Sequence, residues 1–97
     1  MYRIYTMLLN LNEITFTEIW IDPHYELRHK DSINDKLILE LLKIVNFFNL
    51  DLQDINSEGY EFYQINVNYQ DKPYRLILTF PPHKLYVGVV NAYRRSK

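Results

Sequence analysis

The sequence predicts an α+β domain in which a helical hairpin packs on one face of a small antiparallel sheet. Two observations predict this fold class. Residues 60–97 contain three short apolar runs separated by polar turns, a pattern that is typical of strands. Residues 32–49 instead repeat apolar side chains at intervals of three and four, which is typical of an amphipathic helix. With 97 residues and 47% hydrophobic content, the chain is long enough for a single domain with one modest core.

The N-terminal segment is interpreted as a hairpin or a bent strand. Residues 4–9 and 14–21 are rich in β-branched and aromatic side chains, and the polar stretch 10–13 separates them. Trp20 lies in the second of these runs and is expected in the core. These residues therefore predict that the chain begins with strand rather than helix.

Two helices are predicted to follow. Asp22 is a good N-cap and Pro23 suits the first helical position, so a short helix is expected over residues 23–30. Ser32 and Asp35 form an acidic variant of the capping box and predict a second helix. Its apolar stripe, which runs to about residue 49, consists of Ile33, Leu37, Leu41, Ile44, Val45 and Phe48.

The last part of the chain is predicted to form three strands. Residues 50–59 are polar and acidic and are expected to form a loop. A turn is expected at residues 70–73, and Pro81 and Pro82 connect the last two strands because proline cannot continue a central ladder. The three predicted strands are residues 60–69, 74–80 and 85–92.

Charge is distributed unevenly along the chain. Residues 59–97 carry six basic side chains against two acidic ones, a net charge of +4. Residues 1–58 carry five basic side chains against ten acidic ones, a net charge of −5, so the overall −1 is a cancellation. Such a chain can present one cationic face to a polyanion such as nucleic acid while the remainder stays soluble.

Several classes of site and location are disfavoured by the composition. The chain has no cysteine, which excludes disulfides and thiolate chemistry and fits a reducing cytoplasm. No apolar run approaches the roughly 20 residues of a membrane span, and the N-terminus lacks the pattern of a signal peptide. His24 and His29 are five residues apart and cannot share a helix face, so they are given structural or surface roles. We therefore expect no metal, no cofactor and no membrane.

Two segments carry a resemblance to a known family. The first is "IWIDPHYELRH", a strand that leads into a helical hairpin, and the second is "YQINVNYQDKPYRLILTFPPHKLYVGVVNAYRR". In the second, Tyr74-Arg75 opens an apolar strand after a tight turn, and Arg94-Arg95 ends the last strand. This order of motifs resembles the RelE/ParE toxin superfamily of bacterial toxin–antitoxin systems. The resemblance begins at about Phe16 and leaves residues 1–15 as an extra N-terminal strand or hairpin arm of a single domain.

The resemblance implies a RelE-like fold and a metal-independent endoribonuclease that cleaves mRNA on the ribosome. In this chemistry a 2′-hydroxyl attacks the neighbouring phosphate, whose developing charge arginines stabilise and whose protons other side chains move. Arg75 and Arg94, more than Arg95, match the family's arginines. Tyr93 is a candidate for base stacking or proton donation, and His83 is a candidate for acid–base catalysis. The expected RNA-contacting side chains are Lys72, Lys84, Arg95, Lys97, Gln64 and Asn66.

Partners and alternatives follow from the same resemblance. A toxin of this family is neutralised by a cognate antitoxin, can form homo-oligomers or hetero-oligomers with the antitoxin, and acts in the cytoplasm. The strand over residues 60–69 carries neutral amides where the family often carries lysines, and the net charge is not basic. Two alternatives therefore remain open: a non-enzymatic toxin that binds a protein target, as gyrase-directed members do, and a phage or plasmid anti-defence interaction module.

Overall fold

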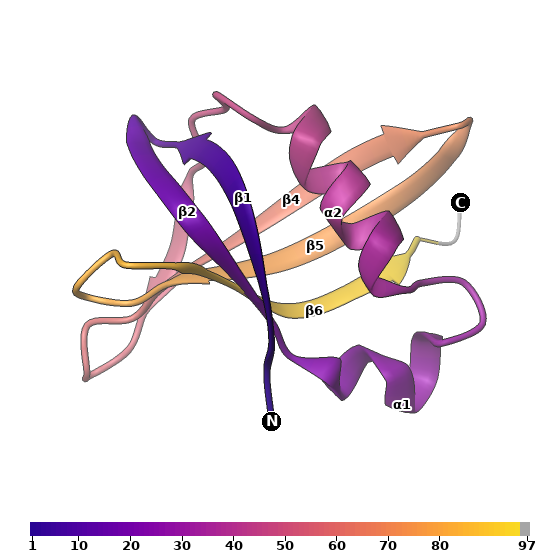
Figure 1. Cartoon of the computed structure of the whole chain (residues 1–97), viewed down its shortest axis with the longest axis horizontal. Helices are drawn as coiled ribbons and strands as arrows, with labels where there is room; N and C mark the ends of the chain where they lie inside the picture. The colour runs from indigo at the N-terminus through magenta and orange to yellow at the C-terminus, as the bar shows by residue number, and fades with distance from the viewer. Residues whose placement is uncertain (96–97) are drawn as a thin grey trace.

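The computed structural model describes residues 1–95 and has a six-stranded mixed sheet with short helices (Figure 1). The strands lie side by side in the order β1-β2-β6-β5-β4-β3. The predicted α+β class is confirmed, and of the two alternatives for the N-terminal segment, a hairpin or a bent strand, the structure has the hairpin. The elements are β1 (Arg3–Leu11), β2 (Ile14–Ile21), the 3₁₀ helix η1 (Pro23–Tyr25), α1 (Glu26–His29), α2 (Asp35–Ile44), β3 (Leu52–Ile55), β4 (Glu61–Tyr69), β5 (Lys72–Phe80) and β6 (Val87–Arg94).

The sheet is mixed, which corrects the expectation of an antiparallel one. Neighbouring strands pair antiparallel except β2 and β6, which run parallel over Ile19–Ile21 and Val87–Val89. The parallel pair forms because the chain passes from β2 through the helices and β3–β5 before β6 returns beside β2. The Asp22 N–H donates to the carbonyl of Val89 at 3.0 Å, which carries the pairing to the start of η1.

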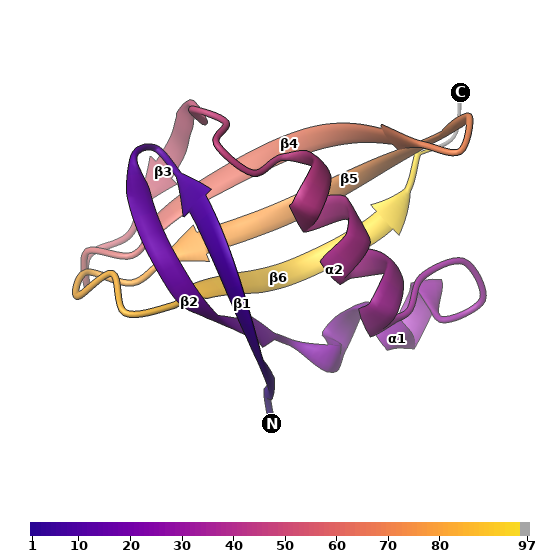
Figure 2. The same ribbon diagram turned by 45° about the horizontal axis from the view of Figure 1, so that its top comes forward.

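One face of the sheet carries the core, and α2 lies across it (Figure 2). Along β4, Tyr63, Ile65 and Val67 are buried while the alternate side chains are exposed, as strand geometry requires. From α2 the buried residues are Ile38, Leu41 and Leu42. Burial of each such aliphatic side chain stabilises the fold by roughly 1.5–3 kcal/mol, so the stripe holds α2 on the sheet.

The helix α2 begins later and ends earlier than the sequence predicts. Its N-cap is Asn34, not Ser32, and the Asn34 side chain accepts a hydrogen bond from the Leu37 N–H at 2.8 Å. The helix ends at Ile44 because the chain turns at Phe47, where φ is +71°. There the Phe47 N–H donates to the carbonyl of Asn10 at 2.7 Å, which ties the turn to the hairpin.

Two further differences concern the loop and the turns. The segment expected to be a loop over residues 50–59 contains β3, which pairs antiparallel with β4 at the edge of the sheet. The β4–β5 turn has only two residues, Gln70 and Asp71, with φ of 52° and 64°, the left-handed values of a tight hairpin turn. It is shorter than residues 70–73 because Lys72 and Pro73 already pair with β4.

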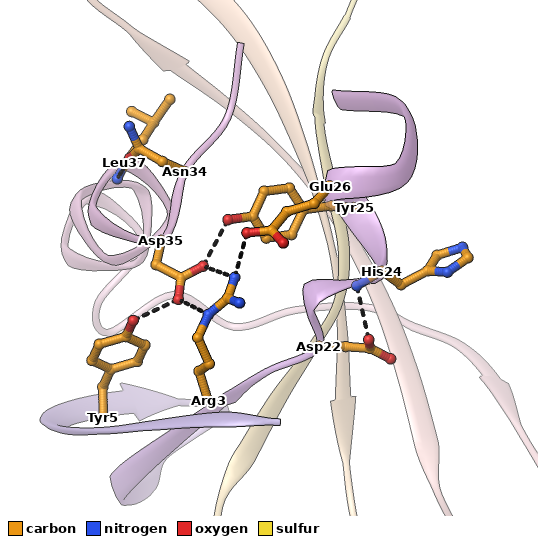
Figure 3. A network of polar contacts seen from close by, with 9 residues as sticks. All are labelled: Arg3, Tyr5, Asp22, His24, Tyr25, Glu26, Asn34, Asp35 and Leu37. Atoms are coloured by element: carbon orange, nitrogen blue, oxygen red, sulfur yellow. Dashed lines mark hydrogen bonds and ion pairs between the residues drawn. The ribbon is translucent and has the colours of Figure 1, made fainter. Parts of the chain in front are cut away.

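A polar cluster, the Arg3 network, ties the N-terminal hairpin to the helices (Figure 3). Arg3 donates to Asp35 through Nε at 2.6 Å and Nη2 at 3.0 Å, and Nη2 also lies 2.7 Å from Glu26. The hydroxyls of Tyr5 and Tyr25 donate to the two Asp35 oxygens at 2.5 and 2.7 Å. A single carboxylate at the start of α2 thus holds β1 and η1 in place.

The hydrogen bonds of this network shift the titration of its members. Burial acts to raise the pKa of Asp35, but the hydrogen bonds from Arg3, Tyr5 and Tyr25 outweigh it and lower this pKa to about 2. The pKa of Tyr25 is raised by burial and by its hydrogen bond to the carboxylate. The pKa of Arg3 is raised by its bond to Asp35, so the guanidinium stays charged and committed to its partners.

Candidate nucleic-acid interface

The face of the sheet opposite α2, here called the open face, carries most of the predicted site residues. Gln64, Asn66 and Asn68 of β4 are exposed, and Arg75 lies next to them on β5. Because directly paired residues in an antiparallel sheet point to the same side, strand register decides which side chains meet there. Asn66 is paired with Arg75, and Arg75 with Tyr93.

These three side chains contact one another across the strands. Arg75 Nε donates to Asn66 Oδ1 at 2.9 Å, and Arg75 Nη1 donates weakly to the Tyr93 hydroxyl at 3.4 Å. The guanidinium carbon also lies 6.0 Å from the centre of the Tyr93 ring, within the range of a cation–π contact. Asn66 and Tyr93 thus orient Arg75 from both sides of β5.

A fourth side chain, His29, joins the group from α1. Its ring stacks on Tyr93 with centroids 5.3 Å apart and an interplanar angle of 29°. The helix α1 lies there because η1, which comes directly after β2 in the chain, packs against β6 and leads into α1. Asp22 caps η1 by accepting a hydrogen bond from the His24 N–H at 2.9 Å. We call Asn66, Arg75, Tyr93 and His29 the Arg75 row. The sequence predicted only a structural or surface role for His29, because its spacing from His24 does not suit a zinc site, and gave no sign of the contact with Tyr93.

A β-bulge in β6 decides which residues reach the open face. The register shifts between Ile77 and Leu78, so Val90 is an extra residue without a direct partner. Before the bulge Val89 is buried, and after it Ala92 is buried and Tyr93 faces outward. Without the bulge, strict alternation from Val89 would turn Tyr93 toward the core.

The same register separates the two C-terminal arginines. Arg94 is paired with Tyr74, a core residue, so Arg94 starts from the helix side of the sheet, opposite Arg75. The Arg95 N–H donates to the carbonyl of Pro73 at 2.8 Å, which extends the ladder and gives Arg95 the side of Arg75. Of the two arginines, Arg95 and not the preferred Arg94 therefore shares the face of Arg75. Lys72 is exposed at the same end of the sheet and, two residues before Tyr74, starts from the same side of β5 as Tyr74. Lys97 lies outside the described residues.

His83 and Lys84, which were predicted as site residues together with Arg75, follow the other end of β5 and are not brought close to Arg75. Arg75 is five residues from Phe80, about 16 Å along the strand, and His83 lies beyond it. His83 Nδ1 accepts a hydrogen bond from the Leu85 N–H at 3.1 Å. The Lys84 ammonium lies 3.5 Å from a Glu61 oxygen, so its charge is already balanced.

Arg75 differs from Lys84 because no carboxylate lies within ion-pair distance of it among residues 1–95. Its two contacts use a neutral amide and a neutral phenol, and a guanidinium has five N–H donors in a planar fork. The remaining donors and the full positive charge are available to an anion. A phosphate, which has several acceptor oxygens, matches this geometry.

The opposite end of the open face is aromatic. Trp20 stacks on Tyr86 with centroids 4.0 Å apart and an angle of 8°, and Tyr2 lies against Trp20. Trp20 is therefore on the open face and not in the core as expected. A cavity of about 390 Å³, here called the Tyr86 pocket, opens beside this stack. Its aromatic walls are Tyr2, Tyr60, Phe62 and Tyr86, and its polar walls are Asp22, Asn56 and Glu58.

No protein-family model, no curated protein and no solved structure matches this chain. Within the part of the chain that the structure describes, no three His, Asp or Glu side chains gather in a group that could hold a metal ion. Over the same residues, no helix is long and apolar enough to cross a membrane. The function is therefore inferred from the chemistry of the open face.

Proposed function

We propose that this protein is a metal-independent endoribonuclease of the toxin–antitoxin type, which cleaves mRNA and is neutralised by a cognate antitoxin. The observation that carries the proposal is the Arg75 row. It combines an arginine that has no carboxylate partner among residues 1–95, a phenol that contacts this arginine, and an imidazole stacked on the phenol. These are the groups needed to hold a phosphodiester and to move protons around it.

Each group has one role in the proposed reaction. Arg75 binds the scissile phosphate and stabilises the charge of the pentacovalent intermediate. His29 accepts the proton of the attacking 2′-hydroxyl, since imidazole exchanges protons readily near neutral pH. The bond from phosphorus to the 5′-oxygen breaks, and Tyr93 donates a proton to that oxygen. The products are a 2′,3′-cyclic phosphate and a 5′-hydroxyl end, after which Tyr93 and His29 recover their protonation states by exchange with water.

The sparse charge of the open face supports a reaction on the ribosome. Beside Arg75 and Arg95, the strands β4 and β5 present amides such as Gln64 and Asn66, which hydrogen-bond RNA without neutralising phosphate. Few cations mean few phosphate contacts and weak binding to free RNA. A ribosome that already holds mRNA would supply the missing affinity.

The test is controlled expression in a bacterial host with mapping of mRNA 5′ ends on translating ribosomes. The wild type should produce new in-frame 5′ ends. Arg75→Ala should reduce them by about 10²–10³-fold, the usual loss when one charge-stabilising donor is removed. His29→Phe keeps a ring against Tyr93 and should reduce cleavage about 10²-fold through loss of proton transfer. Arg94→Ala is the matched control and should retain cleavage within about threefold, because Arg94 starts from the other face of the sheet.

Other outcomes would assign a different function. Growth arrest without new 5′ ends would point to a protein target of the gyrase-directed kind. Neither arrest nor cleavage would point to an interaction module such as an anti-defence inhibitor. Equal losses in Arg75→Ala and Arg94→Ala would show that general basic charge, and not the Arg75 row, is responsible.

A further inference from the structure

The Tyr86 pocket lies on the open face, along the same strands as the Arg75 row. Register places Phe62 beside Thr79 and Thr79 beside Gly88, so these three lining residues form one cross-strand row at the base of the pocket. Trp20 is paired with Gly88 and continues this row outside the lining. A Cβ atom on Gly88 would come within 2.8 Å of Thr79 Cγ2, so a side chain at this position would clash with Thr79 and fill part of the pocket. Phe62 and Asn66 are four residues apart on β4, which separates the two rows by about 13 Å.

The walls of the pocket are held in place before any ligand arrives. The stack with Trp20 fixes the ring of Tyr86. The loop that carries Glu58 and Tyr60 is fastened by Asn56, whose Oδ1 accepts hydrogen bonds from both backbone N–H groups at 3.0 Å. Because this oxygen is occupied, the Asn56 amide nitrogen is the atom that remains to contact a ligand. Prearranged walls of this kind lower the entropy cost of binding.

The lining specifies a flat ligand that has both hydrogen-bond donors and acceptors. Aromatic walls stack on planar rings, the carboxylates of Asp22 and Glu58 accept from N–H donors, and the Asn56 amide donates to a carbonyl. Two carboxylates repel a phosphate, so the occupant is not a second phosphodiester. The volume of about 390 Å³ lies within the ~300–1,000 Å³ of small-molecule sites.

From these observations we infer that the Tyr86 pocket binds a guanine base of the RNA whose phosphate lies on the Arg75 row. Guanine carries two adjacent N–H donors and a neighbouring carbonyl, which match one carboxylate and the Asn56 amide. A strand of a few nucleotides spans the distance between the two rows. An arginine side chain of a protein partner would suit the aromatic and acidic walls but would face the Asn56 amide with donors on both sides. The inference rests on the proposed function, because it assigns the pocket to the same RNA.

The test uses Trp20, the single tryptophan of the chain, as a reporter of the pocket. Purified protein is titrated with guanosine 5′-monophosphate and uridine 5′-monophosphate while tryptophan emission is recorded. Guanosine monophosphate should quench emission saturably and bind at least about fivefold more tightly than uridine monophosphate, since one good bidentate contact to a base discriminates by about 1–3 kcal/mol.

Substitutions locate the binding. Asp22→Asn combined with Glu58→Gln keeps the cap on η1 and the shape of the pocket, and should abolish the preference for guanosine. Asp51→Asn removes one exposed carboxylate outside the pocket and should leave the preference intact. In oligouridine RNA carrying one guanosine, the guanosine should raise affinity about tenfold in the wild type and not in the pocket variant.

Contrary results would separate this inference from the proposed function. A guanosine preference that survives in the Asp22→Asn/Glu58→Gln variant, or an absent response to guanosine monophosphate, would overturn the inference even if Arg75-dependent cleavage is seen. Quenching by an arginine amide instead of guanosine would assign the pocket to a protein partner. Guanosine binding in the Tyr86 pocket without any RNA cleavage would support a base-binding site and contradict the proposed nuclease function.

Discussion

Two arginines on opposite sides of this small domain are held in contrasting ways. Arg3 contacts two carboxylates, at 2.6 Å to Asp35 and 2.7 Å to Glu26, and its carboxylate partner Asp35 is bonded further by two tyrosines. Arg75 contacts the neutral Asn66 amide and the neutral Tyr93 phenol. The first arginine has its charge neutralised inside the fold, whereas the second keeps its charge.

The different partners of the two arginines suit them to different roles: Arg3 stabilises the fold, and Arg75 is able to bind an anion. An ion pair whose other polar atoms are also hydrogen-bonded joins the elements that carry it, here β1, η1 and α2. Loss of one partner leaves the other groups without a hydrogen-bond or charge partner, which destabilises the fold. An oriented but unpaired charge contributes little to stability and retains its attraction for a phosphate. The partners of an arginine therefore indicate its role better than its exposure does, because Arg3 is also 39% exposed.

The largest effect should come from removing the acceptor of the Arg3 network. Asp35→Ala leaves Tyr25, which is 1% exposed, with a buried hydroxyl and no acceptor, and leaves Arg3 with only Glu26. We expect a loss of about 3 kcal/mol in the free energy of unfolding, measured by urea titration. Glu26→Ala, which removes the exposed partner, should cost less than about 1 kcal/mol. Similar losses for the two variants would show that the network is no more than a surface ion pair.

A smaller effect should follow from pH. The pKa of Asp35 is about 2 in the folded protein against an ordinary value of 3.8, so the folded state favours the charged form. The resulting stability is present above pH 4 and is lost as pH falls toward 2, by about 2 kcal/mol in total. Urea titrations at several pH values should show this slope in the wild type. Asp35→Asn should lack that part of the slope, and an equal slope in both would refute the assignment.

The smallest change in stability should follow from giving Arg75 a carboxylate partner of the kind that Arg3 already has. Asn66→Asp gives Arg75 a carboxylate at the position of its present amide partner, 2.9 Å from Nε. Stability should change by less than about 1 kcal/mol, since the pair is exposed. Affinity for a labelled single-stranded RNA, measured by fluorescence anisotropy, should fall about tenfold because the charge is neutralised.

Asn68→Asp is the matched control for this conversion. It adds the same charge to the same face, but Asn68 is paired with Pro73 and not with Arg75. It should weaken RNA binding by no more than about threefold. Equal effects of the two substitutions would mean that the total charge of the face matters and that the pairing of Arg75 does not.

The sequence predicted those parts of the fold that depend on local pattern. Alternation along residues 60–69 placed Tyr63 and Ile65 inside and Asn66 outside, and the structure confirms it. Asp22 before Pro23 correctly marked the start of the short helical segment. The position of Arg75 opposite the apolar face of its strand was likewise predictable, because the pattern of β5 is uninterrupted.

The remainder of the candidate site depends on pairing between distant segments. His29 contacts Tyr93 only because η1 and α1 pack against β6 in space, and no local sequence pattern predicts that contact. The choice between Arg94 and Arg95 depends on the bulge at Val90, which inverts the alternation after it. The parallel pairing of β2 with β6 is invisible for the same reason, since it joins strands more than sixty residues apart.

The strand order has a consequence for the order of events during synthesis. Among residues 1–95 the N-terminal hairpin joins the rest of the sheet only through β6, which is synthesised after the other five strands. Until β6 leaves the ribosome, β2 and β5 each present an unpaired edge, and unpaired edges are where chains associate wrongly. The N-terminal hairpin can therefore complete its pairing in the sheet only after β6 has been synthesised.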